Sequence, residues 1–202
     1  DREYYDTNVS GALNITEYCR ERGVARLFFT SSISVYGPDE TAKVETTPPA
    51  PESPYGCSKL QAELIHQNWQ REDASRHLVI VRPAVVFGPG ERGNFTRLAQ
   101  ALRNHRFFYP GRRDTIKACG YVGELVDTLD FAAKLDRSYF LYNFCYPQTY
   151  TIENICKVLH DSGGLPFPWG TLPFSVMRLA ARPFEWIAKL GLHTGIHRER
   201  ID

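Results

Sequence analysis

Two side chains with complementary acid–base chemistry stand four residues apart in the segment Ser53-Pro54-Tyr55-Gly56-Cys57-Ser58-Lys59. On a helix, residues at positions i and i+4 share a face, so Tyr55 and Lys59 are expected to lie together. An ammonium group beside a phenol favours the phenolate form, and such a tyrosine exchanges protons with a hydroxyl or carbonyl oxygen. The spacing therefore indicates a proton-transfer site, although the two residues alone also suit the start of an ordinary amphipathic helix.

A serine-rich segment precedes this pair by about two dozen residues and reads FFTSSISVYG from Phe28 to Gly37. The apolar residues 26–31 predict a buried β-strand that ends at the serines. A serine hydroxyl at the end of a neighbouring strand is able to hold the same substrate oxygen as the tyrosine. The chemistry therefore requires this strand end to meet the helix that carries Tyr55 and Lys59.

The pattern of the chain alternates between helices and strands, which predicts an α/β layered fold. A helix is expected over 8–22, with Val9, Ala12, Leu13 and Tyr18 on its apolar face and Gly23 as its C-cap. After a proline-rich loop over 38–54, Ser53 caps a helix that runs to about Arg71. Its apolar face is expected to contain Leu60, Leu64, Ile65 and Trp69. Strands are predicted over 78–82 and 139–145, and helices over 94–104, 121–135 and 151–162.

Composition narrows the classes of partner. The chain has 202 residues and a formal charge of +1, from 24 basic and 23 acidic side chains, which gives no reason to expect nucleic acid. Its five cysteines form no CxxC pair, so we expect reduced thiols in the cytoplasm and neither disulfides nor a bound metal. No apolar run is long enough to predict a membrane span.

Three segments together resemble the extended short-chain dehydrogenase/reductase family, the NAD-dependent epimerases and dehydratases of nucleotide sugars. They are FFTSSISVYG, SPYGCSK and LVIVRPAVVFGPG, and the resemblance runs from about Asn8 to Leu125. It implies a Rossmann-like parallel sheet, with a partial dinucleotide-binding domain over 1–150 and part of a small C-terminal substrate lobe over 151–202. It also implies a homodimer formed by the 8–22 helix and the Tyr55 helix, through residues such as Gln61, Leu64, Ile65 and Asn68.

The resemblance also implies roles for the residues of the site. Tyr55 would be the acid/base, Lys59 would bind the nicotinamide ribose, and Ser32 would hold the reacting hydroxyl. The nicotinamide of NAD or NADP would be lined by Thr30, Pro83 and Ala84. The reaction would begin with hydride transfer from C4 of a nucleotide sugar.

Several positions depart from the family pattern. Ile33 and Ser34 stand where dehydratases have an Asp-Glu pair, which favours epimerisation over dehydration. Val85 stands where epimerases often have a substrate-binding Asn, and Lys117 stands where the family has an Arg for the nucleotide pyrophosphate. The substrate-binding candidates are Asn94, Arg112 and Lys117, with helix capping as the alternative for Asn94 and a solvated loop for the two basic residues.

Because of these departures, two other functions stay open: an alcohol/ketone oxidoreductase similar to hydroxysteroid dehydrogenases, and a non-catalytic remnant. No glycine-rich turn stands near the start of the chain, and in the stretch 88–93 Pro89 and Glu91 suit a substrate-side loop better than a phosphate loop. We therefore expect the first half of the sheet to be missing, the strand edge near 26–31 to be exposed, and dinucleotide binding by this chain alone to be poor. Residues 172–190 suit an amphipathic helix interrupted at Pro183, acting as a packing helix, a lid or a membrane-surface element.

Overall fold

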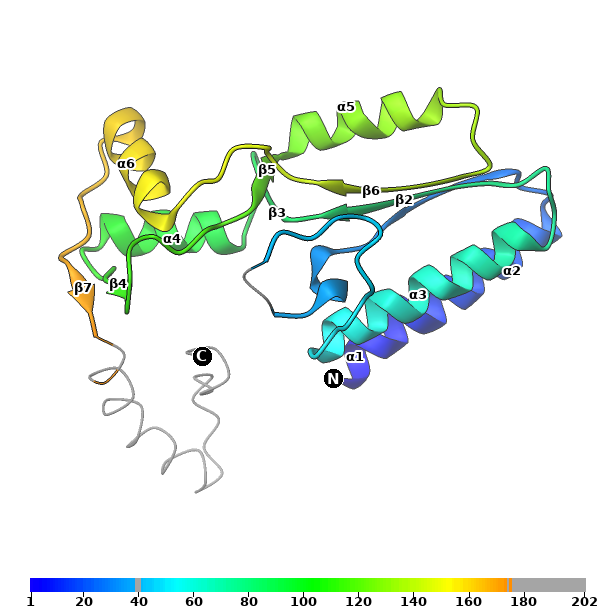
Figure 1. The fold of residues 1–202 in the computed structure, drawn as a ribbon, viewed down its shortest axis with the longest axis horizontal. Helices are drawn as coiled ribbons and strands as arrows, with labels where there is room; N and C mark the ends of the chain where they lie inside the picture. Colours follow the sequence, from blue (N-terminus) through cyan, green and yellow to red (C-terminus); the bar gives the residue numbers. More distant parts are fainter. Residues whose placement is uncertain (39–40, 174, 176–202) are drawn as a thin grey trace, which may run out of the picture. The chain divides into compact units, whose positions relative to one another are not determined.

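The structure is a computed structural model that describes residues 1–38, 41–173 and 175 (Figure 1). The chain forms two compact units, and neither is continuous in sequence: unit 1 contains 1–90 and 118–147, and unit 2 contains 91–117 and the chain from 148 onward. The boundary expected at residue 150 differs from this division. Backbone hydrogen bonds from Lys117 to Tyr150 and from Ile152 to Thr115 tie the 91–117 segment to the later one.

Unit 1 is built on a parallel sheet with the strand order β1-β2-β6 (Arg26–Thr30, His77–Pro83 and Tyr139–Phe144). The central strand β2 is buried from Leu78 to Val81. Its side chains alternate between two apolar clusters, one containing Leu78 and Ile80 and the other Val81. The fold is therefore the predicted Rossmann-like α/β arrangement, and the carboxyl ends of the three strands lie at one edge of the sheet.

Strand β1 differs from the buried strand that its apolar sequence predicts. Its residues alternate in exposure, and Phe28 is 39% exposed. Helix α5 (Val122–Ala133) packs on β2, on the sheet face opposite α2 and α3 (Figure 1). Among the described strands β1 pairs only with β2, which confirms the exposed edge expected near residues 26–31.

The N-terminal helical segment is longer than the predicted helix. It begins with α1 (Arg2–Tyr4), continues through a π-helical stretch (Tyr5–Ser10) and ends as α2 (Gly11–Glu21). Arg22 is the C-cap, and the positive φ of Gly23 directly after it makes the left-handed turn that glycine favours. The expected apolar face is confirmed at Ala12 and wrong at Leu13 and Tyr18, which are exposed, because α2 turns Thr16 and Cys19 inward with Ala12.

Helix α3 (Pro54–Arg71) carries the predicted proton-transfer pair and confirms its predicted start and end. The Ser53 hydroxyl accepts a hydrogen bond from the Gly56 amide at 3.0 Å, and Pro54 occupies the first turn. Trp69 packs into the core with Leu27 and Leu78. Leu64, predicted on the apolar face, is exposed instead, because the buried stripe runs through Ala62, Glu63, His66 and Trp69.

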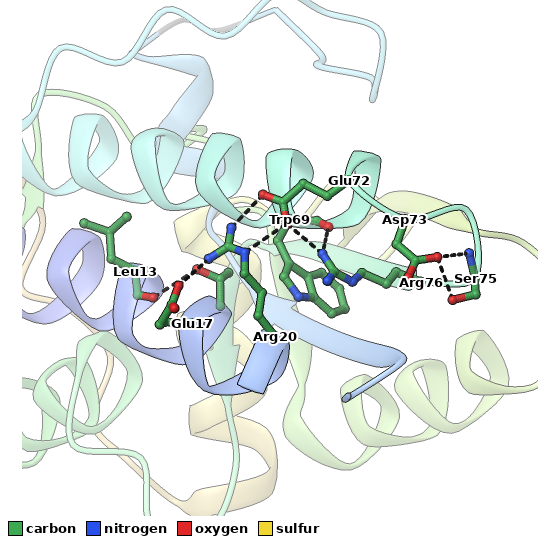
Figure 2. Close-up of polar contacts among 9 residues, drawn as sticks. Leu13, Glu17, Arg20, Trp69, Glu72, Asp73, Ser75 and Arg76 are labelled. Atoms are coloured by element: carbon green, nitrogen blue, oxygen red, sulfur yellow. Dashed lines mark hydrogen bonds and ion pairs between the residues drawn. The ribbon is translucent and has the colours of Figure 1, made fainter. Parts of the chain in front are cut away.

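An ion-pair network joins the ends of α2 and α3, as Figure 2 shows. The guanidinium of Arg20 forms a fork with Glu72, through Nε to Oε2 at 2.9 Å and Nη2 to Oε1 at 2.7 Å. Arg76 donates to the same carboxylate at 2.8 Å and to the Trp69 carbonyl at 2.6 Å, and it also lies over the Trp69 ring. These contacts hold the two helices together at the end opposite Tyr55.

Unit 2 contains α4 (Asn94–Arg103), α6 (Ile152–Gly163) and the short parallel pair β4 (Tyr109–Pro110) and β7 (Thr171–Leu172). Its core is formed by Leu102, Tyr109, Cys156 and Leu165. The predicted Thr151 cap of α6 is confirmed as a capping box with Asn154. Most of the proposed 172–190 helix lies outside the described residues.

Several short elements escaped sequence analysis: β4, β7, the 3₁₀ helix η2 (Ile33–Tyr36), and the parallel pair β3 (Val85–Phe87) and β5 (Cys119–Tyr121). They have two to four residues each, which is too short for a periodic pattern to show. Among the described helices, none is long and apolar enough to cross a membrane.

Acid should weaken the clamp between α2 and α3. Hydrogen bonds from Arg20, and then from Arg76, lower the pKa of Glu72 to about 2 from 4.5. The stabilisation from a lowered carboxyl pKa is complete above the unfolded value and is lost as pH falls toward the folded one. We expect Glu72→Gln to cost about 1 kcal/mol or less at pH 7, since such exposed pairs contribute little, and to flatten the pH dependence between about 5 and 2.

Urea unfolding across this pH range measures the effect, with Glu21→Gln on the exposed side of α2 as the control. If both variants lose stability in parallel with the parent as pH falls, the clamp does not carry the acid sensitivity.

Candidate active site

Helix α3 presents Tyr55 and Lys59 one turn apart, as the sequence predicts, and one contact fixes their place against the sheet. The Lys59 Nζ donates to the backbone carbonyl of Thr30 at 3.0 Å, at the carboxyl end of β1. The ammonium also lies 5.1 Å from the ring centre of Phe29 and 5.9 Å from that of Tyr55. Burial lowers the pKa of Lys59, and the nearby Glu63 carboxylate opposes this shift.

The serines that follow β1 form a turn in front of this helix. Ser32 caps η2, since its Oγ accepts from the Ser34 amide at 3.1 Å, and it also donates to the Ser34 hydroxyl at 3.1 Å. Ser31 is buried, and its Oγ has no hydrogen-bond partner among the described residues. A buried hydroxyl without a partner is costly, which marks this strand end as a place prepared for a polar group of a ligand.

Gly56 lets α3 approach the serine turn. A Cβ on this residue would lie 2.4 Å from the backbone oxygen of Ser34, a distance that no side chain tolerates. The helix position next to Tyr55 therefore touches the turn that begins at Ser32. Sequence analysis assigned no role to Gly56. Its position between Tyr55 and Lys59 was the feature that could have indicated one.

The remaining sequence-predicted residues fall into two groups. Pro83 ends β2 and Ala84 follows it, bonding to the Phe144 carbonyl at 2.9 Å, so both lie at the carboxyl end of the strand next to β1. Asn94, Arg112 and Lys117 belong to unit 2. Asn94 is the first residue of α4 and not its cap, which corrects the capping alternative, and Arg112 forms an ion pair with Asp114.

A buried polar network lies behind the site, and sequence analysis missed it. The guanidinium of Arg82 donates to Glu63 through Nε at 2.9 Å and Nη2 at 2.6 Å, and through Nη1 to the Tyr36 hydroxyl at 2.8 Å. Tyr36 in turn donates to Asn143 Oδ1 at 2.8 Å. The exposed fractions of the Arg82 and Glu63 side chains are 4% and 0%. Two features of the sequence could have indicated this network: Arg82 stands at the end of an apolar strand, and Glu63 stands one helical turn after Lys59.

The only stretch with G-x-G-x-x-G spacing, from Gly88 to Gly93, is unsuited to phosphate. The carboxylate of Glu91 accepts from the Thr96 amide at 2.8 Å and from the Thr96 hydroxyl at 2.5 Å. A Cβ at Gly93 would lie 2.6 Å from the same carboxylate. The protein's own anion therefore occupies the helix N-terminus that a phosphate would need, which supports the reading of 88–93 as something other than a cofactor loop.

The described residues fit one end of a dinucleotide. An ammonium, a phenol and a buried hydroxyl without a partner gather near the carboxyl ends of β1 and β2, where ligands bind in open α/β sheets. Lys59 and Tyr55 suit the nicotinamide ribose. This arrangement of a Rossmann-like sheet with a tyrosine–lysine helix defines a class of dinucleotide-dependent enzymes.

Comparison with known proteins defines the family. The chain belongs to the NAD dependent epimerase/dehydratase family, whose sequence model matches residues 1–144. It is 30% identical over 93% of its length to N-acetyl-alpha-D-glucosaminyl-diphospho-ditrans,octacis-undecaprenol 4-epimerase of Escherichia coli O157:H7, and covers 57% of that protein. It is 38% identical to UDP-glucose 4-epimerase of Vibrio cholerae over 49% of its length and 31% of that protein's.

A solved structure shows the same relationship. MoeE5 in complex with UDP-glucose and NAD is 28% identical, with a TM-score of 0.72 over 81% of this chain and 56% of that one. The chain thus spans just over half the length of the Escherichia coli relative and of MoeE5, and about a third of the Vibrio cholerae relative.

The close contact between Gly56 and the Ser34 carbonyl allows a test of how helix α3 packs at the site. Gly56→Ala forces α3 away from Ser34, and we expect a loss of about 1–3 kcal/mol, as for overpacked cores. Gly11→Ala is the matched control, because Gly11 is also helical and a Cβ there meets nothing within 4 Å. It should stabilise the fold by about 0.4–1 kcal/mol. Urea unfolding of both variants checks the pair, and equal effects of the same sign would contradict the proposed contact.

The buried Glu63–Arg82 ion pair allows a second test, of the cost of leaving one buried charge unpaired. Glu63→Gln leaves a buried guanidinium without its counter-charge, and we expect a loss of about 3–5 kcal/mol or unfolding at room temperature. The double variant Glu63→Leu/Arg82→Met removes both charges and should recover most of that loss. If the double variant is less stable than Glu63→Gln in urea unfolding, the cost does not come from an unpaired charge.

Proposed function

We propose that the protein carrying this chain is an NAD-dependent 4-epimerase of a sugar attached to a diphosphate. The observation that carries the proposal is the bond between Lys59 and the Thr30 carbonyl. It places the Tyr55–Lys59 face of α3 at the carboxyl end of β1, beside the end of β2. The related MoeE5 was solved in complex with NAD, which favours NAD over NADP for this protein.

Each residue has a defined task in this proposal. Tyr55 takes the proton of the sugar's C4 hydroxyl and returns it after the C4 centre has been inverted. Lys59 stabilises the phenolate and holds the ribose, and the Ser32 hydroxyl donates to the same sugar oxygen. Bound NAD would accept the C4 hydride and give it back to the opposite face of the C4 ketone, so that the centre is inverted with no net oxidation. Thr30, Pro83 and Ala84 line the nicotinamide end, and Tyr55 is the acid/base group of the site.

The fraction of the chain that matches each relative indicates whether the sugar diphosphate is attached to a lipid or to a nucleotide. The match to the undecaprenyl-diphosphate epimerase extends over 93% of the chain and thus through both units, while the match to the Vibrio cholerae UDP-glucose epimerase covers 49%. We therefore favour a sugar diphosphate on a polyprenyl lipid over one on a nucleotide. Arg112 and Lys117 are the proposed contacts of the diphosphate, and Asn94 is a proposed contact of the sugar.

Assembly and location belong to the same proposal. Exposed apolar side chains on α2 and α3, such as Leu13, Tyr18 and Leu64, suit a homodimer formed through these two helices. All five cysteines are free thiols, which agrees with a reducing cytoplasm.

Turnover of the whole protein that carries this chain tests the proposal. With N-acetylglucosaminyl-diphospho-polyprenol as substrate, Tyr55→Phe should lower kcat by about 10²–10⁴-fold, because it removes the group that moves the proton. Tyr18→Phe, an exposed tyrosine on α2, is the control and should keep full activity. Full activity of Tyr55→Phe would exclude this mechanism.

The product and the bound cofactor separate the alternatives. Release of a ketone together with NADH, without epimer, would indicate a simple alcohol oxidoreductase. Failure of the whole protein to bind NAD in calorimetry would indicate a non-catalytic remnant. Activity on UDP-N-acetylglucosamine alone would keep the epimerase and exclude the lipid carrier.

A further inference from the structure

Unit 2 exposes aromatic and basic side chains on two neighbouring segments. Trp169 is 68% exposed, Phe167 53% and Phe108 44%, values that are high for large aromatic residues. Arg103, His105 and Arg106 are also exposed. They precede Phe108 in sequence, and the His105 ring contacts that of Trp169. We call this set the aromatic–basic patch: Arg103, His105, Arg106, Phe108, Phe167 and Trp169.

Backbone contacts bring the two segments of the patch together. The Trp169 amide donates to the Phe107 carbonyl at 3.3 Å, and the Tyr109 amide donates to the Gly170 carbonyl at 2.9 Å. The rings of His105 and Trp169 also meet edge to face, with their centres 6.3 Å apart. The patch is therefore one surface of unit 2, although its parts are about sixty residues apart in sequence.

The core of unit 2 does not use these aromatic side chains. The neighbouring residues Phe107, Tyr109 and Leu165 pack into the cluster around Leu102 and Cys156. Phe108 lies between two of these core residues and is exposed, and the indole of Trp169 contacts His105 at the surface. Exposing large aromatic residues costs solvation free energy, which points to a function outside the core.

The charge around the patch is strongly positive, although the whole chain is nearly neutral. Residues 91–117 contain seven arginine and lysine side chains and two carboxylates, against a formal charge of +1 for the chain. In the described part of the chain, Arg112 and Arg113 pair with Asp114 and Glu153, whereas Arg103 and Arg106 have no carboxylate partner. These two guanidinium groups are available to an anionic surface.

We propose that the aromatic–basic patch docks unit 2 onto an anionic lipid bilayer. Tryptophan and phenylalanine side chains partition to the interface between headgroups and acyl chains, and arginines beside them bind acidic headgroups. This inference rests on the proposed function, since an enzyme whose sugar is attached to a polyprenyl diphosphate finds its substrate at a membrane. The membrane location of such a substrate favours a lipid surface over a protein partner, because tryptophan and arginine by themselves suit either.

Vesicle co-sedimentation of the whole protein, without sugar substrate, tests the inference. Vesicles of equimolar phosphatidylglycerol and phosphatidylcholine should bind the protein, pure phosphatidylcholine should bind it much less, and high salt should release it. Arg103→Gln/Arg106→Gln should weaken binding by roughly 25-fold, about fivefold for each charge lost near the surface. Trp169→Ala should weaken it by about tenfold, from the loss of buried apolar area.

Matched variants on unit 1 control for general charge and hydrophobicity. Arg2→Gln/Arg22→Gln removes the same charge, and Phe131→Ala removes an exposed aromatic side chain from α5, so both should bind vesicles as the parent does. A shift of tryptophan fluorescence to the blue on binding, lost in Trp169→Phe, would place Trp169 in the interface.

The outcomes are decisive in either direction. Equal binding to neutral and anionic vesicles, equal losses in patch and control variants, or self-association through the patch in place of lipid binding would overturn the inference. Because the assay contains no sugar, these results do not depend on epimerase activity. Failure to bind vesicles, together with normal turnover of a detergent-solubilised lipid-linked sugar, would remove the docking surface and keep the proposed function.

Discussion

A buried ion pair between Glu63 and Arg82 joins helix α3 to strand β2, and the position of the candidate site depends on it. Glu63 is one turn from Lys59 and two turns from Tyr55, so its bond to β2 sets the rotation of the helix that presents them. Arg82 also reaches the hydroxyl of Tyr36, which bonds to Asn143 on β6. One guanidinium thus connects the helix, the η2 turn that follows Ser32, and two strands of the sheet.

A buried pair of charges is costly to desolvate, so its value lies in geometry more than in net stability. An apolar contact would allow α3 to slide or rotate by small amounts, whereas a bidentate fork fixes both its depth and its angle. Gly56 supplies the complementary constraint at the other end of the helix, because only a residue without Cβ allows contact with the Ser34 carbonyl. Proton transfer needs distances held to fractions of an ångström, and these two features provide that restraint.

The two units of the chain have different surfaces, and the difference agrees with two tasks. Unit 1 holds Tyr55 and Lys59 on helix α3 against a parallel sheet, and the apolar cluster around Trp69 and the clamp between Arg20 and Glu72 hold α2 and α3 in place. In the described part of unit 2, Arg103 and Arg106 have no carboxylate partner and lie near the exposed rings of Phe108 and Trp169.

The sequence by itself determined the local features of the protein. Spacing and capping residues were enough to predict α3, its start at Ser53 and the common face of Tyr55 and Lys59, because these depend on interactions within one turn of helix. The long strands β2 and β6 were also predictable from their apolar runs. The family resemblance, which the match over residues 1–144 confirms, followed from three short motifs.

Only the tertiary structure decided which helix faces are buried, because burial depends on the neighbour and not on hydrophobicity alone. Leu13, Tyr18 and Leu64 look like core residues and are exposed, while Glu63 and Arg82 look like surface residues and are buried as a pair. The split of the chain into two discontinuous units likewise depends on hydrogen bonds between segments more than thirty residues apart, which no local pattern records. Long-range pairing therefore placed the site residues, and local sequence supplied their chemistry.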